Sequence, residues 1–253
     1  MTGTFATKAE LKIFHRPLAI SMKETTYKVI LFDLFHTLVD VGSAPGSSGR
    51  YTADILGVPR DDWNRACFSS AHDICRPTSQ LDVIRTLAHS LDPSIPERLI
   101  REAATERQLR FDHALLQVEP EVLDSLAALR GMGLRLALLS NASTDEVRAW
   151  PGSPLAPLFE QVFFSCECGC AKPQAVFYHH ALNAMGVPPG QALFVGDGGS
   201  DEHAGAREMG IDNVLLTRHI GHYDEARLAP RRAAVKWEVA SLAELTSLLE
   251  RIG

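Results

Sequence analysis

Short apolar segments alternate with helix-like segments along most of this chain, and this alternation restricts the folds that it can adopt. In the helix-like segments apolar residues recur every three or four positions, which is the pattern of a helix with one buried face. Strands that alternate with helices form a parallel sheet with helices on both faces. We therefore predict a doubly wound, Rossmann-like α/β core. The predicted strands are 28–32, 134–139, 162–164, 192–195 and 213–216, and the predicted helices are 120–130, 174–185 and 201–209.

One long segment breaks the alternation. It has no strong strand pattern, but its apolar spacing predicts helices at 80–91 and 96–109. We expect this segment to form an inserted helical-bundle cap domain. The residues before the first strand carry charges throughout, unlike a secretory signal, and we expect an N-terminal extension there. The predicted parts are therefore 1–27 as the extension, 28–43 with 113–253 as the core domain, and 44–112 as the cap domain.

Charge and cysteine content narrow the classes of partner. The chain has 253 residues, a formal net charge of -6 and a pI near 5.9. Nucleic acids and acidic membranes bind basic surfaces, so neither is an expected partner, and no apolar run is long enough to span a membrane. Five cysteines, an odd number, favour a reducing cytoplasm over a disulfide framework. We expect a cytoplasmic protein with a small-molecule substrate.

Asp33 directly follows the first predicted strand, at the start of Asp33-Leu-Phe-His-Thr37. A carboxylate at the end of a buried strand is held rigidly, as a covalent nucleophile requires. An aspartate that caps a turn is the alternative, and this residue alone does not separate the two.

Polar residues also follow two further predicted strands. Ser140 and Asn141 come after 134–139, where hydroxyl and backbone N–H groups can bind an anion, although these residues alone favour an ordinary helix cap. Lys172 precedes Pro173, which restricts its backbone, so its ammonium could be a fixed counter-charge. Most lysines, however, are simply solvated.

The fourth strand end carries the most informative segment, Gly196-Asp197-Gly-Gly-Ser-Asp201. Glycines allow close backbone approach, and Asp197 and Asp201 offer the hard oxygen ligands that Mg2+ prefers. A glycine turn in which Asp201 caps the following helix is the alternative.

These four segments occur in order, each at a strand end, and together they resemble the haloacid dehalogenase-like hydrolase superfamily, in particular its members with a helical cap. The resemblance spans the chain from about residue 28. It implies a hydrolase in which Asp33 is the nucleophile, Thr37 its motif partner, Ser140 the phosphate-binding hydroxyl and Lys172 the neutralising ammonium. It further implies a Mg2+ ion held by Asp33, the Phe35 backbone carbonyl, Asp197 and Asp201.

Phe35 departs from the pattern of the family's phosphatases. They usually carry a second aspartate two residues after the nucleophile, which protonates the leaving alcohol, whereas a phenyl ring cannot. Haloacid dehalogenases of the family resemble this chain at that position, and they need neither this acid nor a metal. His36 and Asp40 are conceivable substitutes for the missing acid. We give more weight to the paired Asp197 and Asp201, which favour a metal site.

The leading hypothesis is therefore a Mg2+-dependent phosphatase of a small phosphorylated metabolite that forms an aspartyl-phosphate on Asp33. The alternatives are a metal-independent 2-haloacid dehalogenase with the same nucleophile, and a phosphate-binding protein that has lost turnover. Phosphonate cleavage through a cap lysine is disfavoured, because 44–112 contains no lysine. Arg65 and Arg76 are the cap residues that we single out as candidates for binding the substrate.

Overall fold

The computed structural model describes Met1, residues 26–42 and residues 49–252. Its centre is a six-stranded sheet in the order β3-β2-β1-β4-β5-β6, and every neighbouring pair of strands is parallel. This confirms the predicted α/β class. The strands are β1 (Val29–Phe32), β2 (Arg135–Ser140), β3 (Gln161–Phe164), β4 (Ala192–Gly196), β5 (Asp212–Leu216) and β6 (Trp237–Val239).

Helices cover both faces of this sheet because each face has its own apolar cluster. The helices α5 (Pro120–Gly131) and α10 (Leu242–Ile252) contribute to one cluster, and α7 (Ala175–Met185) and α8 (Glu202–Glu208) to the other. Two further helices of the core are α6 (Ser165–Cys168) and α9 (Glu225–Ala233). Short 3-10 turns lie in the segments between the strands and helices of the core. They are η1 (Asp145–Val147), η2 (Trp150–Gly152), η3 (Ala156–Leu158), η4 (Pro189–Gln191) and η5 (Gly199–Asp201).

The central position of β1 determines where the candidate site lies. All four residues of β1 are buried, and Phe32 pairs with Leu138 of β2 and Val195 of β4. Asp33 therefore leaves the sheet between the carboxyl ends of β2 and β4. The strand order reverses between β1 and β4, and parallel α/β sheets bind ligands at such a reversal.

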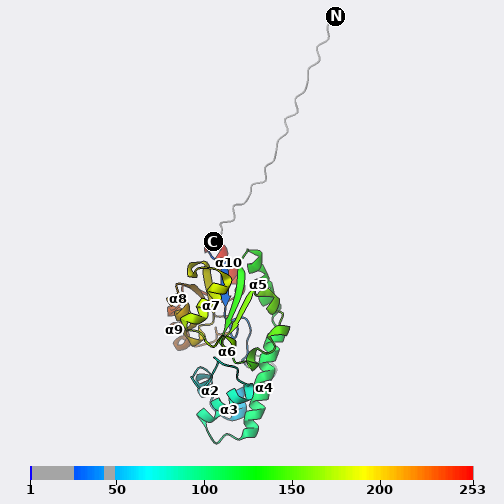
Figure 1. Ribbon diagram of the computed structural model, residues 1–253, viewed down its shortest axis with the longest axis vertical. Helices are drawn as coiled ribbons and strands as arrows, with labels where there is room; N and C mark the ends of the chain where they lie inside the picture. The colour runs from blue at the N-terminus through cyan, green and yellow to red at the C-terminus, as the bar shows by residue number, and fades with distance from the viewer. Residues whose placement is uncertain (2–25, 43–48, 253) are drawn as a thin grey trace.

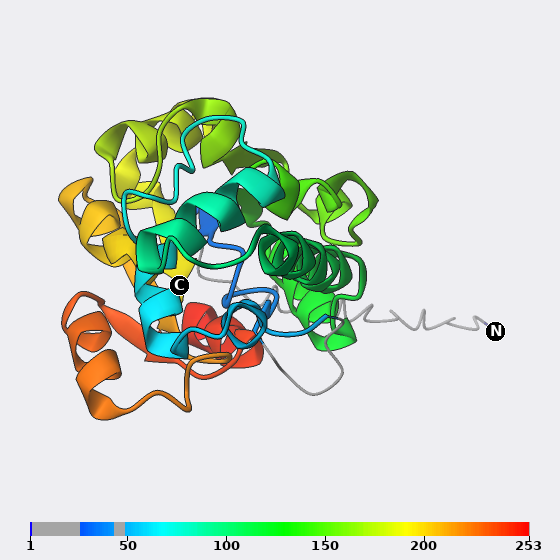
Figure 2. The ribbon, with the colours of Figure 1, turned by 90° about the horizontal axis from the view of Figure 1, so that it is seen from below.

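Four helices lie beyond these carboxyl ends and pack around an apolar cluster of their own. They are α1 (Thr52–Leu56), α2 (Arg60–Cys67), α3 (Gln80–Leu91) and α4 (Glu97–Leu116). Figure 1 shows α2 and α3 at the end of the molecule away from the C-terminus, with α4 running from them to the core. In Figure 2, seen from that end, the cyan to teal helices lie in front of the core. The predicted helical cap is therefore present, and the exact division at residue 112 stays a prediction.

The helix α4 belongs to both parts. Ala103 in its first half packs in the cap cluster, whereas Phe111 and Leu115 near its end pack in the core cluster. Polar contacts also join the two parts, because the Ser165 hydroxyl donates to the Ile74 carbonyl at 2.6 Å and Arg227 pairs with Asp61 at 3.1 Å. The cap is thus held over the ends of the strands.

The structure corrects one expected element and adds others. Between β2 and β3, where the alternation of strands and helices would give a helix, the chain forms separate 3-10 turns after Thr144. Pro151, Pro154 and Pro157 follow at intervals of three residues, and proline has no N–H to continue an α-helix. The strand β6 and the helices α1, α9 and α10 were not predicted. Most of the expected N-terminal extension, residues 2–25, lies outside the described residues, as does the predicted start of the cap at 44.

No helix in the described part of the chain is both long and apolar enough to cross a membrane.

Candidate active site

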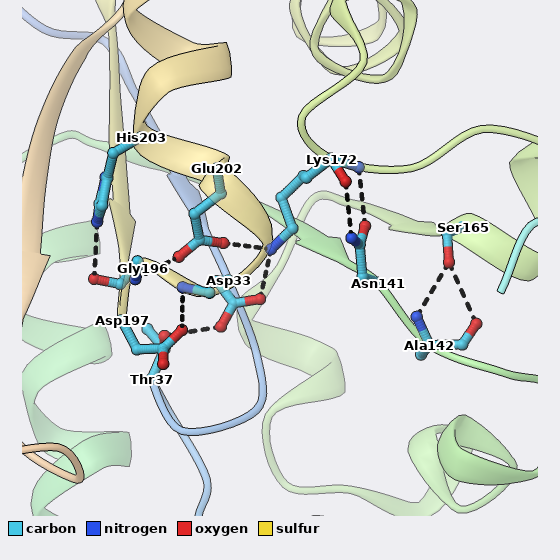
Figure 3. A network of polar contacts seen from close by, with 12 residues as sticks. Asp33, Thr37, Asn141, Ala142, Ser165, Lys172, Gly196, Asp197, Glu202 and His203 are labelled. Atoms are coloured by element: carbon cyan, nitrogen blue, oxygen red, sulfur yellow. Dashed lines mark hydrogen bonds and ion pairs between the residues drawn. The ribbon is translucent and has the colours of Figure 1, made fainter. Parts of the chain in front are cut away.

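Asp33 lies buried at the end of β1 with a partner on each carboxylate oxygen. The Thr37 hydroxyl donates to Oδ2 at 2.7 Å, and the Lys172 ammonium donates to Oδ1 at 2.5 Å (Figure 3). Thr37 reaches Asp33 because the chain turns sharply between them, with hydrogen bonds from the N–H groups of Leu38 and Val39 to the Leu34 carbonyl. Thr37, from the same predicted segment as Asp33, and Lys172, from a separate one, are therefore both in direct contact with Asp33.

Two further buried carboxylates, those of Asp197 and Glu202, join this group. One oxygen from each of Asp33, Asp197 and Glu202 can be chosen so that all lie within 4.8 Å of one another. Glu202 accepts hydrogen bonds from Lys172 Nζ at 2.7 Å and from the Gly198 N–H at 2.9 Å. Asp197 accepts one from the Gly199 N–H at 3.0 Å. In the described residues this is the only group of three or more potential ligands.

The charges of the group do not balance. Three buried carboxylates face one buried ammonium, so the site has an excess of negative charge. Burial, with the neighbouring carboxylates Asp33 and Asp197, raises the pKa of Glu202 to about 8 despite Lys172. Burial and the charge of Asp33 also raise the pKa of Asp197. Burial alone would lower the pKa of Lys172, but Asp33 and Glu202 hold it above its usual range. A set of oxygen ligands with excess negative charge fits a small divalent cation.

The structure separates Glu202 from Asp201, the residue predicted as a metal ligand. Asp201 is exposed and is not a member of the carboxylate group, whereas Glu202 is 1 % exposed. Ser200 and Asp201 both have positive φ angles, so the chain changes direction just before α8 begins. The geometry therefore does not bring Asp201 to the site and brings Glu202 there instead. One signal pointed to this: Glu202, Gly205 and Ala206 have the spacing of a single helix face, and all three are buried.

Close packing holds α8 against the lysine segment. A Cβ atom on Gly205 would lie 2.6 Å from the Pro173 carbonyl oxygen, closer than a Cβ atom can approach an oxygen without a clash. We expect Gly205→Ala to push α8 away from this segment and to lower the free energy of unfolding by about 1–3 kcal/mol, the usual cost of overpacking. Denaturant unfolding monitored by circular dichroism measures this.

Gly131→Ala is the matched control, because Gly131 lies in α5 and its Cβ would have open space around it. Alanine favours a helix over glycine, so this variant should be at least as stable as the original chain. Equal stability of both variants would contradict the close contact at Gly205.

Ser140 and Asn141, predicted together to bind the substrate, differ from each other in their surroundings. Ser140 is the last residue of β2, fully buried, and its hydroxyl has no hydrogen-bond partner among the described residues. Asn141 instead fixes the backbone of Lys172: its amide donates to the Lys172 carbonyl at 2.9 Å and accepts from the Lys172 N–H at 2.8 Å. Asn141 thus positions the lysine, and its predicted contact with substrate stays a prediction.

The residues after the nucleophile point in two directions. The ring of Phe35 packs edge-on against Phe111 of α4, with centroids 4.9 Å apart.

His36 has a positive φ and forms a hydrogen bond from Nδ1 to Asp40 at 3.1 Å. Burial raises the pKa of Asp40 less than the hydrogen bonds from His36 and Gly42 lower it, so it falls to about 2. Asp40 is therefore ionised at neutral pH.

Neither cap arginine proposed from sequence reaches the carboxylate group. Arg65 pairs with Asp62 and Arg76 with Asp73, and the side chains of both arginines are more than two-thirds exposed. Both pairs join residues three positions apart on the surface of the cap.

Comparisons with known proteins agree with this geometry. A protein-family model described as "Hydrolase: haloacid dehalogenase-like hydrolase" matches residues 27–208. The chain is similar to a phosphoserine phosphatase of Thermus thermophilus, with 31% identity over 76% of this chain and 89% of the relative. It is also similar to (S)-2-haloacid dehalogenase 1 of a Pseudomonas species, with 25% identity over 89% of this chain and 97% of the relative. Among solved structures, L-2-haloacid dehalogenase from Xanthobacter autotrophicus with chloropropionic acid covalently bound has the same fold (TM-score 0.65, 21% identity, 90% of this chain and 100% of that chain).

Proposed function

Because this chain belongs to the haloacid dehalogenase-like hydrolases, we propose that it is a Mg2+-dependent phosphatase of a small phosphorylated metabolite and that Asp33 is its nucleophile. The observation that carries the proposal is the buried group of Asp33, Asp197 and Glu202, whose negative charge Lys172 only partly offsets. A dehalogenation that needs no metal gives no reason to gather two further buried carboxylates, Asp197 and Glu202, beside the nucleophile.

In the proposed reaction a carboxylate oxygen of Asp33 attacks phosphorus and the bond from phosphorus to the alcohol oxygen breaks. Water then attacks the aspartyl-phosphate, which releases inorganic phosphate and regenerates Asp33. Thr37 and Lys172 hold the attacking carboxylate in one orientation. The ammonium of Lys172 and the unpartnered hydroxyl of Ser140 are placed to stabilise the oxygens of the transferred group.

The acidic group would hold the metal ion through Asp33, Asp197 and Glu202, and the resemblance to the family implies the Phe35 backbone carbonyl as a further ligand. When bound, Mg2+ supplies positive charge that offsets the repulsion between the carboxylate and the phosphate. The chain's own groups keep this site ordered: the Gly198 and Gly199 N–H groups bind the two acidic side chains, and Arg231 donates to the Asp197 carbonyl at 3.0 Å.

Removing divalent metal tests the proposal directly. Nitrophenyl phosphate is the appropriate substrate, because nitrophenolate leaves without a proton and the missing acid at position 35 then matters little. We expect dialysis against a chelator to reduce its hydrolysis by at least about 100-fold, since the metal supplies several kcal/mol of charge stabilisation. Added Mg2+ should restore the rate, and Ca2+ serves as the control ion. Full activity after complete metal removal would refute the phosphatase mechanism.

One observation favours the second candidate, a 2-haloacid dehalogenase. Position 35 carries an aromatic ring, and a dehalogenase releases a halide that needs no proton. A relative carries the name of that activity. Chelation again separates the two reactions: release of chloride from 2-chloropropionate that is insensitive to chelator would establish the dehalogenase, and we expect none.

The proton for an ordinary leaving alcohol must come from a group other than Phe35, whose ring packs against Phe111. Of the two substitutes that the sequence offers, Asp40 is ionised at neutral pH, so His36, which is hydrogen-bonded to it, is the one left to donate the proton.

A further inference from the structure

A second polar cluster lies between the cap and the core, apart from the carboxylate group. Its centre is an ion pair between Arg107 of α4 and Glu146 of η1, whose side-chain atoms Nη2 and Oε1 are 2.5 Å apart. We call it the seam cluster, and its members come from the cap, from α4 and from the turn after β2. They are His72, Gln80, Arg107, Gln108, Ser143 and Glu146.

The chain's own contacts bring these side chains to one turn. The Ser143 N–H donates to Glu146 Oε2 at 2.9 Å, and His72 Nε2 lies 3.9 Å from Glu146 Oε1. The Gln80 N–H donates to the Asp145 side chain at 2.7 Å. Gln108 donates to the Asp145 carbonyl at 2.7 Å. All of them therefore surround residues 143–146.

Within this cluster many polar atoms are buried without a hydrogen-bond partner among the described residues. Both ends of the Gln80 amide are unpartnered although the residue is only 4 % exposed. The others are His72 Nε2, Arg107 Nε, Gln108 Oε1 and Ser143 Oγ. Each buried polar atom without a partner costs free energy, and folded proteins hold few of them. Their concentration at one turn indicates that a polar ligand binds there.

Two routes lead from the cluster toward the catalytic group, one through Phe111 of α4 and one along the segment after β2. The Arg107 guanidinium lies 4.4 Å from the centroid of Phe111, and Phe111 in turn contacts Phe35, two residues after the nucleophile. Along the other route, Ser143 follows Ser140 at the end of β2, and both hydroxyls are unpartnered. A molecule with its phosphate at Asp33 would therefore extend its opposite end toward the seam cluster.

The unpartnered polar atoms of the seam cluster determine which chemical group of a ligand can bind there. Arg107 and Glu146 cancel each other's charge, and the other nearby guanidinium, that of Arg110, donates to Val41, Arg50 and Thr52. The free atoms include donors (Arg107 Nε and the Gln80 amide nitrogen) and acceptors (the amide oxygens of Gln80 and Gln108), with the Ser143 hydroxyl able to act as either. Hydroxyl groups, which both donate and accept, match this set. A carboxylate would face Glu146 and two amide oxygens.

We propose that the seam cluster binds the end of the substrate opposite the phosphate, and that it selects a neutral, hydroxyl-bearing chain over one that ends in a carboxylate. This inference rests on the proposed phosphatase activity and adds the class of substrate, a polyol or sugar phosphate. Gln80 is its most informative residue, because its side chain makes no hydrogen bond to the described protein and so serves no structural purpose that the geometry shows.

The experiment compares substrates that differ only at the far end. Glycerol 3-phosphate is paired with 3-phosphoglycerate, and sorbitol 6-phosphate with 6-phosphogluconate, so that two chain lengths are covered. We expect kcat/KM to favour the polyol in at least one pair by at least about tenfold, because a site that hydrogen-bonds a hydroxyl group discriminates against an analogue that leaves its polar atoms unpaired. Equal values in both pairs, or preference for the acids, would overturn the inference while nitrophenyl phosphate hydrolysis still supports the phosphatase. Absence of hydrolysis of any phosphate ester would refute the proposed function and this inference with it.

The variant Gln80→Met keeps the length of the side chain and removes its amide. We expect kcat/KM for the preferred polyol phosphate to fall about tenfold relative to that for nitrophenyl phosphate, because the amide's hydrogen bonds are lost. Its stability should equal or exceed that of the original chain, since no hydrogen bond to the described protein is removed. Gln161→Met, on the exposed first residue of β3, is the matched control and should keep the original ratio. Ser143→Ala provides a second test, because its hydroxyl is equally unpartnered. If both seam variants fold and keep the original ratio, the cluster holds only buried water and the inference is wrong.

Discussion

Asp33→Asn is expected to reduce phosphate ester hydrolysis by roughly four or more orders of magnitude, as loss of a covalent nucleophile does in other hydrolases. The amide has nearly the shape of the carboxylate and can still accept from Thr37, so the fold should persist while the nucleophile is lost. Steady-state hydrolysis of nitrophenyl phosphate measures the rate, and acid quenching followed by mass spectrometry detects the aspartyl-phosphate on residue 33.

Asp124→Asn is the control for Asp33→Asn, because Asp124 is exposed on α5 and is not a member of the carboxylate group. It should retain the original rate. Substantial turnover by purified Asp33→Asn protein would show that another group attacks the substrate.

The paired variants Glu202→Gln and Asp201→Asn should differ by at least about 100-fold in turnover, the typical effect of removing one preorganised electrostatic group from an active site. Glu202 accepts hydrogen bonds from Lys172 and the Gly198 N–H at the carboxylate group, and a neutral amide there weakens both the lysine contact and the affinity for Mg2+. Asp201 is exposed, so its variant should stay within about threefold of the original chain, as surface changes do.

Titrating each variant with Mg2+ separates metal affinity from the maximal rate. For Glu202→Gln we expect half-maximal activity to need more Mg2+, and for Asp201→Asn the unchanged concentration. The reverse result, an inactive Asp201→Asn and an active Glu202→Gln, would restore the assignment that the sequence suggested.

Most of the strands that were predicted correctly share one property. Four of the five, β1, β2, β4 and β5, are short apolar runs whose residues are largely buried, and such runs are easily seen in a sequence. The strand β6 was not predicted, because it has only three residues and one of them is a glutamate. It is a strand because it pairs with β5. Pairing between strands that are distant in the sequence is not encoded by either segment alone.

The site was predictable at the level of strand ends but not at the level of single side chains. Asp33 and Asp197 each follow a buried strand, and Lys172 precedes a proline that restricts its backbone, so these three positions could be predicted. Glu202 and Asp201 are adjacent, and the positive φ angles at Ser200 and Asp201 decide which of them faces the site. The spacing of the residues in the sequence does not predict those angles. The position of Arg107 was also not predictable, because it depends on how α4 is rotated about its axis. The packing of Phe111 against Phe35, which fixes that rotation, is seen only in the structure.

The position of β1 in the middle of the sheet also affects how the chain must fold during synthesis. Its two neighbours, β2 and β4, begin about 100 and 160 residues later in the chain. Until β4 has been synthesised, an entirely apolar strand has at least one unpaired edge, and such edges promote association between chains. The cap helices lie between β1 and β2 in sequence and make mainly local contacts, so they can form before the sheet does. Chains truncated before β4 should therefore aggregate even though they contain the complete cap.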